Sequence, residues 1–379
     1  MIVKYTNPFP SPEQEQLLKA ALFNENEAVK AWQQWNQVVN FEGYFDHASF
    51  RLLPLVYKNL SHLQPEVMFA GKLKNVYLQS WYKNQNLFYF CSQVTAYLSE
   101  NQVYPLILKG IPLSILAYKD RGARPMSDID MMIQLHEAER TLRLLREQGW
   151  IPENEEYIEY NLQYGKSICL KNDQDIELDI HWYPFFEAHG KAGVNDFTDR
   201  KYAFKVNDVQ LYSLSPSDML IHVITHGLHY NPEPPIRWIP DCLMLFRNLG
   251  DQIDWEYFYH QMIKFGITLK VKLALGYLKE TFHLQIPENA EKILLKAHVS
   301  YRERIIYKNS KLIEEEKELR FFRKLFQLYL IYLQQSGEKG ILKQMIGYIK
   351  FLRFRTHYEN PLKVLFYHIF VKRKQENKY

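Results

Sequence analysis

The stretch DIDMMI, residues 128–133, alternates acidic and apolar side chains before it becomes wholly apolar. Side chains alternate between the two faces of a β-strand, so this pattern predicts a strand with Asp128 and Asp130 on one face and Ile129 and Met131 on the other. Two carboxylates this close repel each other unless a cation lies between them. Oxygen ligands of this kind suit Mg²⁺ or Mn²⁺. The stretch therefore predicts a divalent-metal site.

A second alternating stretch supplies a third acid. In IELDIHW, residues 176–182, apolar side chains alternate with Glu177, Asp179 and His181. If the two strands are neighbours, Asp179 completes a two-metal site, in which one ion activates an attacking hydroxyl and the other stabilises a leaving pyrophosphate. We therefore predict that Asp128, Asp130 and Asp179 are the catalytic residues and the metal ligands.

His181 shares the predicted face of Asp179, and two interpretations of it stay open. It could orient Asp179, which could in turn serve as the general base for an acceptor hydroxyl. Alternatively, it is a structural histidine that forms a hydrogen bond.

Candidate phosphate ligands precede the first acidic stretch. Lys109 and Gly110 end a short apolar stretch that is typical of a strand, and a helix-compatible stretch follows them. Glycine lets a phosphate approach the backbone, a helix N-terminus favours an anion, and Lys109 adds a positive charge. Arg121 and Arg124, in the loop before residue 128, are further candidates.

The order of these features matters more than any one of them. A lone DxD pair is more typical of a solvated turn at the edge of a strand, and a lone Lys-Gly pair is weaker still. Here a strand, a glycine, a helix, a loop, an acidic strand, a helix and a second acidic strand follow one another. This ordered set favours a functional site.

Three regions are expected along the chain. Residues 1–100 have helical periodicity, including a helix start at Ser11-Pro12-Glu13. Residues 101–214 alternate between strand and helix patterns, and residues 215–379 are again helical with a basic tail. We expect an α+β fold with a small mixed sheet embedded between N-terminal and C-terminal helical regions.

Composition restricts the cellular setting. The 379 residues are 47% hydrophobic, which suffices for a core, and the three cysteines lack CxxC spacing. Neither a disulfide framework nor a cysteine zinc site is expected. No signal peptide and no membrane-spanning run are recognised, so a cytoplasmic protein is expected.

The C-terminal segment is strongly basic. From Arg320 to Tyr379 there are 13 Lys or Arg against 3 Glu, interleaved with aromatic residues. Such a surface could bind nucleic acid, anionic lipid or an acidic partner protein. The alternative, which we favour slightly, is an amphipathic helical subdomain with buried aromatic rings and solvated charges.

Several of these motifs resemble the polymerase-beta superfamily, and in particular its bacterial "nucleotidyltransferase family" branch. The resemblance covers roughly residues 100–265. Its motifs here are Leu108-Lys109-Gly110, Tyr118, Arg124, Asp128-Ile129-Asp130, Asp179-Ile180-His181-Trp182, residues 214–220, His222, His226 and residues 237–241.

The resemblance implies metal-dependent transfer of a nucleoside monophosphate from an NTP to a hydroxyl-type acceptor. Asp128 and Asp130 fall on the two metal-ligand positions, Asp179 on the third acid and Gly110 on the phosphate-binding turn. Ile111 follows Gly110 where the superfamily usually has serine or glycine. The phosphate would then depend on Lys109, on backbone amides or on Ser114, with His181 also near the nucleotide.

Three questions stay open at this point. The acceptor could be a protein side chain, a tRNA end, a small metabolite, or a glycan or peptide product. Alternatively, the altered turn suits a catalytically inactive nucleotide-binding or partner-binding module. His222, His226 and His229 share a helix face at spacings i, i+4 and i+7, which suits either zinc ligands or, as we favour, histidines that form hydrogen bonds with nearby groups or line the acceptor cleft. Asp241 is a potential partner of Arg237.

Overall fold

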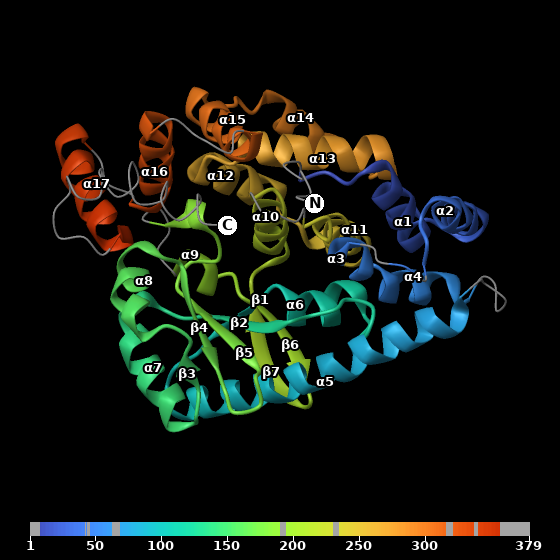
Figure 1. Ribbon diagram of the computed structural model, residues 1–379, viewed down its shortest axis with the longest axis horizontal. Helices are drawn as coiled ribbons and strands as arrows, with labels where there is room; N and C mark the ends of the chain where they lie inside the picture. The colour runs from blue at the N-terminus through green and yellow to red at the C-terminus, as the bar shows by residue number, and fades with distance from the viewer. Residues whose placement is uncertain are drawn as a thin grey trace, which may run out of the picture.

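The fold is given by a computed structural model. It describes residues 8–41, 43, 46–62, 69–189, 195–229, 235–315, 321–336 and 340–356. In the described residues, a mixed sheet lies between helices contributed by both ends of the chain (Figure 1). The α+β class expected from the sequence is confirmed.

The sheet has seven strands in the order β3-β4-β5-β2-β1-β7-β6. Their bounds are β1 Leu106–Leu108, β2 Asp128–Met132, β3 Ile151–Pro152, β4 Ser167–Lys171, β5 Glu177–His181, β6 Tyr202–Val206 and β7 Val209–Ser213. β2 pairs with β5, and β1 with β7, in parallel, while the other pairs are antiparallel. The two acidic stretches are therefore neighbouring strands, as the sequence predicts.

The N-terminal region consists of helices. They are α1 Pro12–Leu22, α2 Glu25–Val38, α3 His47–Phe50, α4 Leu53–Leu60 and α5 Ala70–Glu100. The predicted helix start is confirmed, because the Ser11 hydroxyl accepts a hydrogen bond from the amide of Gln14 and the Gln14 side chain accepts one from the amide of Ser11.

Further helices cover the sheet and continue to the C-terminal side. They are α6 Gly110–Pro112 with the π-helical η1 Leu113–Tyr118, α7 Ala138–Glu147, α8 Ile158–Tyr164, α9 Asn195–Thr198, α10 Pro216–Gly227, α11 Trp238–Leu249, α12 Trp255–Phe265, α13 Thr268–Phe282, α14 Glu288–Lys296, α15 Tyr301–Glu315, α16 Phe321–Gln335 and α17 Ile341–Thr356. No helix in the described part of the chain is long and apolar enough to cross a bilayer.

The two faces of the sheet pack differently. One face, which includes Ile129 and Met131, is buried against α5 and α7. The other face carries Asp128, Asp130 and Asp179 and is turned toward α10 and α11 (Figure 1). The alternation of β2 therefore separates an apolar core face from a polar face, as the sequence predicts.

The N-terminal and C-terminal helices share one hydrophobic cluster. Residues such as Leu17 and Leu53 belong to the same buried cluster as Leu220, Ile239 and Leu278. Helices from the N-terminal and C-terminal regions therefore pack into one core.

The basic C-terminal segment is described only as far as residue 356. Aromatic side chains of α16 and α17, including Tyr332 and Phe351, form a small buried cluster with Tyr164 of α8. The prediction for residues beyond 356 lies outside the described residues.

Substitution of Gly227 by alanine should loosen the packing of α10 on α11. An added Cβ would lie 2.2 Å from the Trp238 Cβ, so the helices must separate. We expect the free energy of unfolding to fall by about 1–3 kcal/mol. Gly276→Ala in α13 is the control, because nothing lies within 4 Å of its added Cβ. Equal stability of Gly227→Ala and Gly276→Ala in urea unfolding would contradict this packing.

Asp218 should make the stability depend on pH. Its carboxylate is buried at the start of α10, where it accepts hydrogen bonds from Ser215 and Tyr257, and burial raises its pKa to about 6. Because the folded-state pKa lies above the ordinary value, the protonated form stabilises the fold, and this contribution is lost as pH rises through about 6. Relative to Asp218→Asn, wild type should lose about 2–3 kcal/mol between pH 4 and pH 8. Parallel stability curves for the two proteins would contradict the assignment.

Candidate metal centre and phosphate cleft

Asp130 is the most enclosed of the three acids. Only 3% of the residue is exposed. One carboxylate oxygen, Oδ1, contacts the Lys109 ammonium and lies 2.8 Å from Nε2 of His181. Its charge is therefore balanced by a cation and by a hydrogen-bonding group, as a buried carboxylate requires.

Asp179 lies directly opposite Asp130 in the parallel register of β2 and β5. Donor atoms of Asp130, Asp179 and His181 all lie within 4.8 Å of one another, so these residues could hold a metal ion. Burial, followed by the negative charges of Asp130 and Asp128, raises the pKa of Asp179 to about 6, although Lys109 opposes the shift. Two carboxylates and an imidazole are a donor set that divalent ions accept.

Asp128 lies at the start of β2, on the same face as Asp130. It is half-buried, accepts a hydrogen bond of 3.1 Å from the Ser127 hydroxyl and lines the neighbouring cavity. It is not part of the group formed by Asp130, Asp179 and His181. Asp128 and Asp130 both line the cavity, and Asp179 lies across from Asp130 on β5.

His181 contacts Asp130 rather than Asp179. Its Nε2 is 2.8 Å from Oδ1 of Asp130 and 3.8 Å from Oδ2 of Asp179. The second distance is too long for a hydrogen bond, so His181 does not orient Asp179 in this way. Burial, and then the charges of Lys166 and Lys109, hold its pKa well below the ordinary value. The ring is therefore neutral, and its buried Nδ1 has no partner among the described residues.

Lys109 takes an unusual backbone conformation, with φ of 49° and ψ of −106°. Few non-glycine residues adopt such a conformation, and strain of this kind is concentrated at functional sites. Burial disfavours the ammonium, but Asp130 and then Asp128 raise the pKa of Lys109 above its ordinary value. The lysine stays charged beside the acids.

A cavity of about 180 Å³ opens beside the acids. It lies between the adjoining ends of β1 and β2 and the helices α10 and α11. Its polar lining consists of Arg51, Lys109, Arg124, Ser127, Asp128, Asp130, His222, His226, Arg237 and Asp241. Basic and acidic groups at the rim of one cavity suit a metal-bound polyphosphate.

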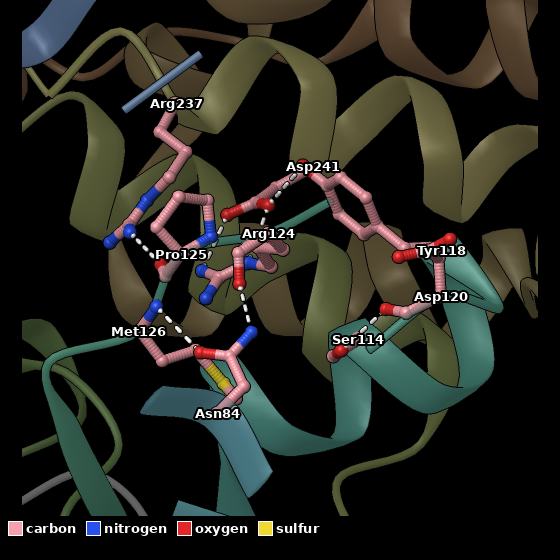
Figure 2. A network of polar contacts seen from close by, with 9 residues as sticks. All are labelled: Asn84, Ser114, Tyr118, Asp120, Arg124, Pro125, Met126, Arg237 and Asp241. Atoms are coloured by element: carbon pink, nitrogen blue, oxygen red, sulfur yellow. Dashed lines mark hydrogen bonds and ion pairs between the residues drawn. The ribbon is translucent and has the colours of Figure 1, made fainter. Parts of the chain in front are cut away.

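Arg124 and Asp241 form a buried bidentate pair at one side of the cavity (Figure 2). Nε and one terminal nitrogen of Arg124 each lie 2.8 Å from the Asp241 carboxylate, and the Tyr118 hydroxyl donates to it at 2.7 Å. Asp241 therefore pairs with Arg124. The sequence had suggested Arg237 as its partner, and that suggestion is wrong. Arg237 donates instead to the Pro125 carbonyl at 2.6 Å.

Two predicted phosphate ligands face elsewhere. Arg121 donates to Gln85 and stacks over the Phe88 ring, and it is not among the residues that line the cavity in the described part of the chain. The Ser114 hydroxyl is buried and donates to the Asp120 carbonyl at 2.8 Å (Figure 2). Neither is placed to hold a phosphate at this cavity, because sequence spacing does not reveal which way a loop or a π-helical turn directs its side chains.

Gly110 lines the cavity, but packing alone explains the glycine. An added Cβ would lie 2.6 Å from the Met126 sulfur and 3.2 Å from a terminal nitrogen of Arg124. The loop that carries Arg124 and Met126 is held in turn by Asn84 of α5, which bonds to both backbones (Figure 2). The glycine is required because this loop crosses close over it.

His222 and His226 line this cavity, and burial holds their pKa values well below the ordinary range; the acceptor cleft stays a prediction. Neither belongs to a metal-ligand cluster within the described residues. Arg51, which follows α3, and Lys166, which precedes β4, were missed, because neither lies in a motif and only the fold brings them to the site.

Comparison with known proteins identifies the family. Residues 48–283, more than half of the chain, match the family described as "uncharacterised nucleotidyltransferase", and the chain belongs to it. No curated protein matches the chain. Among solved structures, the chain is similar to an antigenic nucleotidyltransferase-like protein from Paracoccidioides brasiliensis, with 12% identity and a TM-score of 0.35 over 55% of this chain and 92% of that chain.

Replacement of Asp241 by asparagine should destabilise the protein strongly. It would leave the buried guanidinium of Arg124 without its counter-charge, which costs about 3–5 kcal/mol. Glu155→Gln is the control, because it breaks the exposed Arg146–Glu155 pair and should change stability by less than about 1 kcal/mol. Chemical unfolding measures both, and an Asp241→Asn effect as small as that of the control would refute the structural role of the pair.

Proposed function

We propose that this family member is a divalent-metal-dependent nucleotidyltransferase, which transfers a nucleoside monophosphate from an NTP to a hydroxyl-type acceptor. Asp128, Asp130 and Asp179 are the proposed metal ligands and catalytic residues, with His181 as a further ligand or a hydrogen-bonding partner. The observation that carries the proposal is the parallel register that sets Asp179 beside Asp130, which lines a cavity rich in basic side chains.

The cavity supplies groups for a triphosphate. Lys109 and Arg237 present cationic side chains there, and Arg51 reaches it from the N-terminal region. Such cations hold phosphate oxygens and offset the charge that develops as pyrophosphate leaves. Bound Mg²⁺ or Mn²⁺ would supply Lewis-acid stabilisation and would lower the pKa of the attacking hydroxyl.

Asp179 is the proposed general base. Its side chain is 24% accessible, whereas that of Asp130 is 2% accessible, so an acceptor hydroxyl can approach Asp179 more readily. The neutral ring of His181 keeps Asp130 hydrogen-bonded without adding a positive charge. The free thiols of Cys91, Cys169 and Cys242 suit a reducing compartment, so we place the protein in the cytoplasm.

A second candidate function is a nucleotide-binding module without turnover. The side chain of Ile111 is buried in the sheet core rather than turned to the cavity, so the residue after Gly110 offers no side-chain hydroxyl to a phosphate. The two functions differ in one property, because only an enzyme releases pyrophosphate.

Turnover should depend on the acids. Each of the four labelled NTPs is incubated with Mg²⁺ or Mn²⁺ and a mixture of candidate acceptors, including tRNA, peptides and small hydroxylated metabolites. Asp128→Ala combined with Asp130→Ala should reduce pyrophosphate release at least about 100-fold. Asp173→Ala, in the turn between β4 and β5, is the control and should match wild type.

Two results would decide against catalysis. Equal pyrophosphate release by wild type and the double variant would assign the activity to a contaminant. Metal-dependent nucleotide binding by wild type without pyrophosphate release, for all four NTPs and all acceptors, would favour the module.

A further inference from the structure

Lys166 is the last residue before β4, and none of the residues that the structure describes forms an ion pair with its side chain. Its ammonium lies 5.6 Å from the centre of the Phe186 ring. The ammonium forms no hydrogen bond and no ion pair within the ranges that the structure describes. Lys109, by contrast, is paired with Asp130.

Along the strand order, Lys166 and Lys109 lie on either side of the two acidic strands. The order β4-β5-β2-β1 sets the acidic strands β5 and β2 between the strand that Lys166 precedes and the strand that Lys109 follows. Ser167, next to Lys166, pairs with His181, and Leu108, next to Lys109, pairs with Asp130. Both lysines therefore start from the part of the sheet that carries the centre.

The three acids lie close enough to Lys166 to act on its ammonium. Asp130, Asp179 and Asp128 all favour its charged form, while Lys109 opposes it. Burial, the largest effect, together with Lys109 lowers the pKa of Lys166 to about 8, so most of the lysine is still cationic at neutral pH.

The other polar groups on this side are already engaged. Glu187, two residues before His189 and next to Phe186, forms a 2.7 Å ion pair with Lys270. The ring of His229 lies 5.6 Å from that of Phe186, and burial holds the pKa of His229 at about 4, so it is neutral. Neither Glu187 nor His229 therefore neutralises Lys166.

We propose that Lys166 binds an anionic oxygen of the substrates, as a second anion-binding position on the β4 side of the centre, across the acids from Lys109. This ammonium contacts the Phe186 ring, and a partly buried ammonium without an anionic partner is unfavourable. A phosphate or carboxylate oxygen relieves that cost. This proposal rests on the proposed function, which brings substrates to the acids. The anion belongs either to the phosphates of the NTP or to a charged group on the acceptor.

Binding measurements separate the two sources. Isothermal titration calorimetry with Mg²⁺ uses an NTP analogue whose α and β phosphorus atoms are joined by methylene, and then inorganic phosphate added to protein saturated with the analogue. Lys166→Met should weaken one of these ligands by about tenfold, since a hydrogen bond to a charged group contributes about 1.5–3 kcal/mol. Lys166→Arg should restore most of the affinity.

Lys171→Met is the matched control. Lys171 ends the same strand, where it pairs with Glu153 and Glu177 away from the cavity. The Lys171→Met variant should bind both ligands with the affinity of wild type. Thermal unfolding of each variant verifies that it is folded, and the rescue by arginine excludes a purely structural effect.

Each outcome bears on one proposal. Loss of analogue binding in Lys166→Met assigns the anion to the NTP, and loss of phosphate binding alone assigns it to the acceptor. Unchanged binding of both ligands overturns the role of Lys166 but leaves the proposed function standing. If wild type binds phosphate but no analogue, and Lys166→Met loses the phosphate, the proposed function fails while the anion position stands. If wild type binds neither ligand, the anion position is refuted as well.

Discussion

The buried pair of Arg124 and Asp241 is the constraint on which the cleft depends. It joins the loop before β2 to helix α11, which lie 117 residues apart in the sequence. The loop continues directly into the strand of Asp128 and Asp130, so its position fixes where these acids face. Because Arg124 is fully committed to a buried counter-charge, separation of the helices from the sheet would expose or unpair two charges at once. The pair therefore sets the distance between the acids and the opposite wall of the cavity.

The negative charges of Asp130 and Asp179 are compensated to different degrees by neighbouring groups. Asp130 is held by Lys109 and His181, whereas Asp179 has no cation in direct contact among the described residues and has a raised pKa. The Asp130 carboxylate is thus held by two partners, whereas that of Asp179 remains open to a further cation. Lys166 adds a cation on the β4 side of the acids, and no described residue forms an ion pair with it. Metal, phosphate and acceptor are the three groups that would complete this balance.

The sequence alone predicted the acids and their strands but not their neighbours. Alternation is a local property of each strand, so the common face of Asp128 and Asp130 followed from it. That Asp179 shares this face depends on the pairing of β2 with β5, which the sequence left as a condition. Arg51 and Lys166 could not be found in the same way, because strand order and helix docking bring them to the site from 77 residues before and 38 residues after Asp128. Arg121 and Ser114 were misplaced for a related reason: a loop and a π-helical turn have no fixed period from which side-chain direction can be inferred. The partner of Asp241 depends on tertiary packing and was likewise assigned wrongly.

The central claim is that Asp130 and Asp179 hold a catalytic divalent ion beside this cavity. The most direct measurement is anomalous X-ray scattering from a crystal soaked with Mn²⁺ and a non-reactive NTP analogue. The account predicts an anomalous peak bound by carboxylate oxygens of Asp130 and Asp179, with a phosphate oxygen of the analogue in the same coordination shell. A nucleotide bound without any Mn²⁺ at these carboxylates, or Mn²⁺ bound only elsewhere on the protein, would contradict it.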